Sequence, residues 1–138
     1  MTGRAVAFLA ERKYIVYILF VLCTITTLLL TLLPPENFEN RSVFQYDKLG
    51  HFLIFFGWTL LFGFSWLIRK KKILNLWIIF IIGALFGIGI ELAQGLLPYD
   101  RSPNVYDAIA DIAGSYAAVL CLGYLQNRYH SYINDHYK

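Results

Sequence analysis

The chain has 138 residues, of which 58% are apolar and 15% charged. A soluble domain is usually about half apolar and about a quarter charged, so this composition argues against an ordinary soluble protein. The net charge of +3 does not indicate nucleic-acid binding, because the basic residues cluster beside apolar stretches of about twenty residues, the length that crosses a bilayer. Cys23 and Cys121 lie within such stretches, so we expect no disulfide framework.

Four apolar segments follow one another along the chain, each long enough to cross a bilayer as a helix. The first is too long for the core of a signal peptide and no small-residue cleavage pattern follows it, so we expect it to be retained. Prolines end the first and third segments, at Pro34 and Pro98, and the basic run 69–72 separates the second from the third. The prediction is one all-α domain over residues 1–138, an integral membrane four-helix bundle with helices at 14–33, 48–68, 73–97 and 105–125.

The distribution of lysine and arginine predicts how the bundle is oriented. Nine of these twelve residues lie in the two terminal tails and the run 69–72. The other loops hold the remaining three, which are Arg41, Lys48 and Arg101. Because short loops rich in lysine and arginine stay in the cytoplasm, both termini are predicted to be cytoplasmic.

Ionisable side chains lie inside three of the four segments, always near the end predicted to be extracytoplasmic. At 1.5 Å per residue, Glu91 and Asp111 each lie about 9 Å inside an apolar segment. A charge deep in a membrane helix costs roughly 2.5–3.5 kcal/mol, so these carboxylates must face protein, water, a cation or each other. Other polar residues lie at or above the same level: Asp47, Lys48, His51, Gln94 and Asp107.

Helical spacing predicts that these groups face the interior of the bundle. Gly87 and Glu91 are four residues apart, as are Asp107 and Asp111, so each pair shares one helix face. Small residues at this spacing let membrane helices approach closely. We therefore expect one outward-facing polar pocket between the second, third and fourth helices.

The pocket would hold more carboxylates than basic groups. Shared protons, a divalent cation or a cationic ligand would each balance that charge. Oxygen ligands suit magnesium, manganese or calcium better than zinc, and the candidate ligands are Asp47, Glu91, Asp107 and Asp111. Side chains at the rim can hold a phosphate or carboxylate. The candidate catalytic residues are His51, Glu91, Asp107 and Asp111, and the candidate ligand-binding residues are Asp47, Lys48, Gln94 and Arg101.

Each of these residues also has a purely structural interpretation. Asp47 and Asp107 can cap helices, and Gln94 can bridge two helices. Glu91 and Asp111 are harder to explain in this way, because they are ionisable and lie deep in apolar segments. The remaining residues can serve at the interface or in a loop: Lys48, His51 and Arg101.

The runs YDKLGHF and ELAQGLLPYDRSPNVYDAIADIAGS resemble the VanZ-like family of bacterial membrane proteins. In that family, Asp-Lys-x-x-His opens one helix and Glu-x-x-Gln ends the next. An arginine follows in the loop, and Asp-x-x-x-Asn-x-x-Gly opens the last helix. The resemblance covers residues 47–118, with Asp111 where the family usually has asparagine. The matching residues are Asp47, Lys48, His51, Glu91, Gln94, Arg101, Asp107 and Gly114.

The resemblance implies a multi-pass protein of the bacterial inner membrane whose pocket faces the extracytoplasmic side. The family is similar to a protein associated with low-level resistance to teicoplanin-type glycopeptide antibiotics. This implies a cell-envelope role, with a lipid head group or a lipid-linked envelope precursor as partner. Asp111 adds a negative charge where an amide would be neutral.

Three functions are compatible with the sequence. In the first, which we favour, the protein binds or modifies a lipid-linked or head-group ligand at the outer leaflet. In the second, it is a divalent-metal-dependent hydrolase or transferase acting on a phosphate-containing lipid, with His51 as general acid or base and Arg101 on the phosphate. In the third, it is a non-enzymatic structural or partner protein, and the polar residues only fix the register of the helices.

Overall fold

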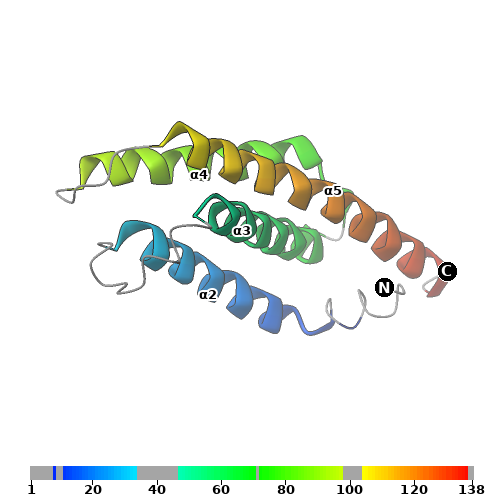
Figure 1. Cartoon of the computed structure of the whole chain (residues 1–138). Helices are drawn as coiled ribbons and strands as arrows, with labels where there is room; N and C mark the ends of the chain where they lie inside the picture. Colours follow the sequence, from blue (N-terminus) through cyan, green and yellow to red (C-terminus); the bar gives the residue numbers. More distant parts are fainter. Residues whose placement is uncertain (1–7, 9–10, 34–46, 71, 98–103, 137–138) are drawn as a thin grey trace.

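A computed structural model describes residues 8, 11–33, 47–70, 72–97 and 104–136. The regular structure in these ranges is all helical. The helices run side by side, and α2 begins at the end of the bundle where α5 finishes (Figure 1). We call this the terminal end and the opposite end the polar end. The elements are α2 (Lys13–Leu32), α3 (Asp47–Lys70), α4 (Leu76–Leu96) and α5 (Val105–His136).

Prolines set the ends of two helices at the polar end, as the sequence predicted. Leu33 and Leu97 follow the last residues of α2 and α4, and each precedes a proline. Their backbones are extended, with φ −73° and ψ 148° at Leu33 and φ −77° and ψ 146° at Leu97. A proline disfavours the helical conformation of the residue before it, so these helices end where they do for a steric reason.

Helices α3 and α5 both continue past the residues where the sequence analysis ended them. The last turn of α3 includes Arg69 and Lys70, and α5 runs to His136 although a polar tail was predicted from residue 126. Apolar length reveals only the part of a helix that suits the hydrocarbon core, and no proline stops either helix there. Basic side chains in the last turn also favour a helix through its dipole.

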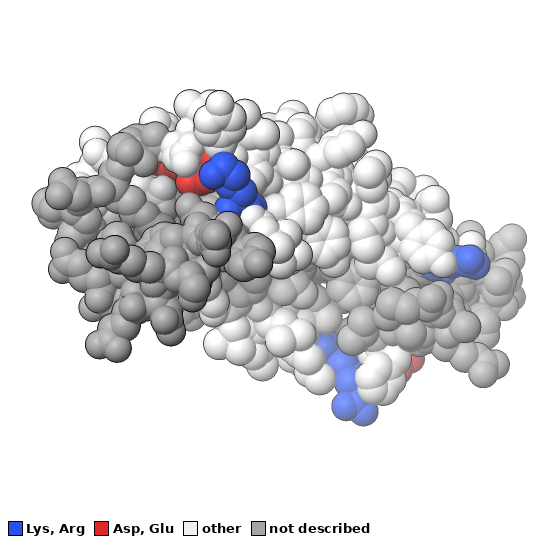
Figure 2. Space-filling model, viewed as in Figure 1, with Lys and Arg blue, Asp and Glu red and all other residues white. Residues whose placement is uncertain are grey.

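The outer surface of the bundle is apolar, and all four helices are long and apolar enough to cross a membrane. Leucines on each of them are largely exposed, as at Leu22, Leu53, Leu85 and Leu120. On the face seen in Figure 2, charged side chains gather toward the two ends and the described surface between them is uncharged. A lipid bilayer accommodates such a surface, so the protein is a multi-pass membrane protein.

Helix α3 lies at the centre of the bundle and packs against the three others. At the terminal end the core is apolar, and its members include Phe64, Leu67 and Leu122. Helix α2 is peripheral, with Val16, Thr27 and Thr31 as its buried residues. The indole of Trp58 on α3 donates a hydrogen bond to Thr24 of α2, 2.9 Å away.

Glycines bring the helices into backbone contact near the polar end. A side chain at Gly114 of α5 would collide with the backbones of Phe52 and Phe56 in α3. At Gly87 of α4, a side chain would collide with Asp111 of α5. The predicted small-residue faces are therefore contact faces, and the groups beside them meet across short gaps.

Candidate functional site

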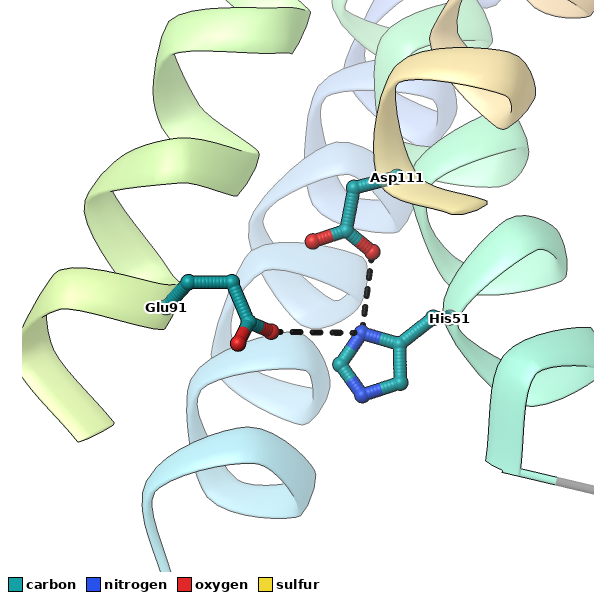
Figure 3. A group of neighbouring side chains, drawn as sticks. All are labelled: His51, Glu91 and Asp111. Carbon is teal, nitrogen blue, oxygen red and sulfur yellow. Dashed lines mark hydrogen bonds and ion pairs between the residues drawn. The ribbon is translucent and has the colours of Figure 1, made fainter. Parts of the chain in front are cut away.

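Three ionisable side chains meet inside the bundle at the polar end. His51 of α3, Glu91 of α4 and Asp111 of α5 point toward one another from three helices (Figure 3). The imidazole Nδ1 of His51 lies 2.9 Å from Oδ1 of Asp111 and 3.8 Å from Oε1 of Glu91. His51 and Glu91 are each 5% exposed and Asp111 is 0% exposed. We call these three residues the central cluster.

The central cluster lies a short distance inside the membrane-spanning part of the chain. His51 comes four residues after Asp47, Glu91 five before Leu96, and Asp111 six after the start of α5. At 1.5 Å per residue, these offsets place the three groups about 6–9 Å from the helix ends. The carboxylates therefore lie at a common level, as predicted, one to two turns inside the candidate spans.

Glu91 also ties α4 to the start of α5. Its Oε2 accepts a hydrogen bond of 3.1 Å from the backbone N–H of Asn104. Asn104 caps α5, because its side-chain oxygen accepts a 3.0 Å bond from the N–H of Tyr106. A helix N-terminus carries a partial positive charge, which favours a carboxylate there. Among the described residues, Glu91 Oε1 has no hydrogen-bond partner.

Lys48 and Asp107 form a second, outer pair between α3 and α5. Their Nζ and Oδ1 atoms are 3.9 Å apart, and the side chain is 60% exposed for Lys48 and 9% for Asp107. The lysine therefore lies at the rim, as predicted, while the carboxylate is inside. Asp107 belongs to the first turn of α5 and follows the cap residue Asn104. Such a position also suits the structural interpretation of Asp107.

Gln94 reaches away from the central cluster toward α2. Its Nε2 donates a 2.8 Å hydrogen bond to the backbone carbonyl of Thr31. Gln94 thus bridges two helices, which was its structural interpretation, and α2 closes this side of the bundle. The sequence analysis did not identify Thr31, because a carbonyl acceptor has no side-chain pattern that could indicate it.

Two predicted site residues lie outside what the structure describes. For Asp47 only the helical backbone is described, and Arg101 falls in the range 98–103, outside the described residues. The roles assigned to their side chains therefore stay predictions.

The central cluster combines groups that can bind a cation or move a proton. One ligand atom from each residue lies within 4.8 Å of the others, so small movements would let all three contact one ion. A carboxylate that binds a histidine ring also fixes its orientation, as general acid–base sites require. The sequence predicted a site made of carboxylate oxygens alone. Because the central cluster also offers an imidazole nitrogen, it suits transition-metal ions better than that predicted site would.

Comparisons with known proteins agree with the sequence pattern. A family model described as VanZ/LLP1 matches residues 6–126. The Uncharacterized protein C11E3.10 of Schizosaccharomyces pombe is 32% identical over 74 residues, which are 54% of this chain and 44% of that protein. This chain therefore spans less than half the length of that relative. No solved structure matches the chain.

Proposed function

The chain belongs to the VanZ/LLP1 family, and from this premise we propose that it binds the head group of a lipid or lipid-linked ligand through the central cluster. The ligand would enter from the membrane surface at the polar end. In a bacterial host with both termini in the cytoplasm, this is the extracytoplasmic leaflet. The activity would then belong to the cell envelope.

The observation that carries this proposal is the burial of the central cluster inside the candidate membrane spans, one to two turns from their ends at the polar end. Ionisable groups inside a membrane helix are costly and usually mark a ligand or ion site. Nδ1 of His51 already contacts Asp111 at 2.9 Å, but Glu91 Oε1 has no hydrogen-bond partner within the described chain. A buried acceptor without a donor costs free energy, and a ligand donor would remove that cost.

The charges of the site indicate what kind of head group it accepts. The site contains three carboxylates, from Glu91, Asp107 and Asp111. Its basic groups are Lys48 and His51, which contribute at most two positive charges when His51 is protonated. With all three carboxylates ionised, the described site would carry a net negative charge. A head group that presents an ammonium group, or a phosphate with its divalent counter-ion, complements it.

Antibiotic susceptibility and lipid retention test the proposal together. We would express the wild type, Glu91→Gln and Asp111→Leu in a glycopeptide-sensitive bacterium and measure the inhibitory concentration of teicoplanin. The purified proteins would be examined for bound lipid by native mass spectrometry. We expect wild type to raise the inhibitory concentration and to retain a lipid, and both site variants to lose these properties at equal abundance in the membrane.

Glu11→Gln is the matched control, since it removes an exposed carboxylate outside the site. It should behave as wild type in both measurements. If the site variants retain the same lipid as wild type, the binding proposal is wrong. If lipid retention depends on the site but susceptibility does not change, the ligand is bound and the link to glycopeptides is wrong.

A metal-dependent membrane hydrolase or transferase is the second candidate. The convergence of one imidazole and two carboxylates within 4.8 Å supports it. In this case the central cluster would hold a divalent cation that polarises a phosphate ester, and Asp107 would lie beside it as a base. Arg101 would hold the phosphate.

Cation binding distinguishes the two candidates. We would titrate purified wild type and Glu91→Gln with manganese and with zinc, following the ion by calorimetry and the protein by thermal unfolding. An ion that binds the native state stabilises it by mass action. The enzyme candidate requires that wild type bind one ion and be stabilised, and that Glu91→Gln do neither. It is excluded if wild type binds neither metal.

A further inference from the structure

A groove between α2 and α3 lies at the terminal end, opposite the central cluster. Its volume is about 710 Å³. Half of the lining residues are aromatic: Tyr17 and Phe20 from α2, and Phe62 and Trp66 from α3. The rings contact one another, with centroids 5.8 Å apart for Phe20 and Phe62 and 5.5 Å for Phe62 and Trp66. A long apolar groove of this kind fits an acyl chain.

A buried hydroxyl in the wall has no hydrogen-bond partner. Ser65 lines the groove and is 9% exposed, and its Oγ is unpartnered within the described part of the chain. Helical serines and threonines in apolar surroundings usually donate to a carbonyl one turn earlier. Three of the four threonines of α2 do so over 2.7–2.9 Å: Thr24, Thr27 and Thr31. Ser65 makes no such bond among the described residues, so a bound molecule with an oxygen acceptor would satisfy its hydroxyl.

Two basic side chains from the last turn of α3 line one part of the groove. Arg69 and Lys70 form the last turn of α3 and line the groove, and both are exposed. No carboxylate of the described residues pairs with either one. A guanidinium and an ammonium group beside an apolar groove complement a phosphate attached to acyl chains.

We propose that this groove binds one anionic phospholipid. Its phosphate lies between Arg69 and Lys70, its ester region accepts the hydrogen bond of Ser65, and an acyl chain lies along Phe62 and Trp66. This site is independent of the function proposed for the central cluster, since it occupies the other end of the bundle and shares no residue with it.

Fluorescence quenching by brominated lipids tests the proposal on the full chain. The protein is placed in phosphatidylcholine vesicles with a minor fraction of acyl-brominated phosphatidylglycerol or, in parallel, of acyl-brominated phosphatidylcholine. The fluorescence of Trp66 is obtained by subtracting the fluorescence of Trp66→Phe from that of wild type. We expect an apparent affinity at Trp66 that is up to roughly 30-fold higher for the brominated phosphatidylglycerol, as two surface basic residues predict. Equal quenching by the two lipids would overturn the proposal.

A second tryptophan tests whether the preference for the anionic lipid belongs to this groove. Trp77 lines a smaller groove of about 300 Å³ between α4 and α5, whose described lining has no basic side chain. Quenching of Trp77, taken as wild type minus Trp77→Phe, should not depend on the head group. A preference of the same size at Trp77 would also overturn the proposal.

The charge variants complete the test. Arg69→Gln with Lys70→Gln should make the two brominated lipids equivalent at Trp66. Arg12→Gln with Lys13→Gln removes the same charge from the terminal end without changing the groove lining, and it should keep the preference. If both double variants lose the preference equally, the lipid is attracted by net charge alone and the groove is not a specific site. Ser65→Ala should instead lower the apparent affinity of both brominated lipids by roughly 5-fold for one hydrogen bond, because both carry the ester groups, and it should keep the preference.

Discussion

The two ends of the bundle are built from the same helices but differ in what fills the space between them. At the terminal end, α3 and α5 meet through Phe64, Leu67 and Leu122. At the polar end, the same two helices meet through His51 and Asp111. The terminal end shows that this bundle packs without buried charges. The ionisable groups of the polar end are therefore an addition to what packing requires, and this is why we assign function to them.

The difference between the two ends matters more in a lipid bilayer than it would in a soluble protein. Acyl chains are as apolar as leucine, so burial alone does not drive membrane helices together. Close packing holds the terminal end, and hydrogen bonds with close backbone contact hold the polar end. Variants of the two kinds of contact should therefore differ in how much they lower the free energy of unfolding.

Removing the imidazole should have the largest effect. His51→Leu leaves Glu91 and Asp111 buried with an apolar neighbour, and we expect the free energy of unfolding to fall by roughly 3 kcal/mol. Reversible unfolding in mixed detergent micelles would measure it. His51→Gln is the control, since its amide can still donate to Asp111 and should cost less. If His51→Leu is as stable as wild type, the cluster does not hold the polar end together.

A substitution at the backbone contact of Gly114 should have the second largest effect on stability. A methyl group there would meet the backbones of Phe52 and Phe56, which cannot move as a side chain can. We expect Gly114→Ala to lower the free energy of unfolding by about 2 kcal/mol. At Gly89 a side chain would meet nothing within 4 Å, so Gly89→Ala should be neutral or stabilising by about 0.5 kcal/mol. Equal effects of the two alanines would contradict the close approach of α3 and α5.

The two carboxylates of the cluster should couple unequally to His51. Asp111 lies at 2.9 Å and Glu91 at 3.8 Å from the same Nδ1 atom. In double-mutant cycles with His51→Leu, we expect a coupling of about 1.5 kcal/mol for Asp111→Asn and below about 0.5 kcal/mol for Glu91→Gln. The reverse order would mean that Glu91, not Asp111, fixes the imidazole.

The outer pair should matter least. Lys48 is largely exposed and its Nζ lies 3.9 Å from Asp107. Lys48→Gln should therefore change the free energy of unfolding by less than about 0.5 kcal/mol, since exposed pairs are weak. It should nevertheless weaken retention of the ligand if Lys48 lies at the entrance of the site. A loss of stability as large as that of His51→Leu would show that the pair is structural.

The architecture of this protein could be predicted from its sequence. Apolar length located the four spans, and prolines ended α2 and α4. Helical spacing placed Glu91 and Asp111 on contact faces beside glycines, and the run of motif residues gave the family that the comparison then confirmed. These features depend on lengths and spacings along one helix, which a sequence states directly. The orientation of the bundle and the link to glycopeptides stay predictions.

Which polar groups meet could not be predicted without the packing of the helices. The sequence placed Gln94 with the carboxylates, but it bonds to Thr31 of α2. It did not join Asn104 to Glu91, because that donor is a backbone N–H. The predicted end of α5 was too early, because an apolar stretch indicates only the part of a helix that suits the hydrocarbon core, and α5 continues beyond that stretch to His136. The groove between α2 and α3 was also not predicted from the sequence. Contacts between helices depend on rotation and distance across the bundle, and spacing along one chain does not state these.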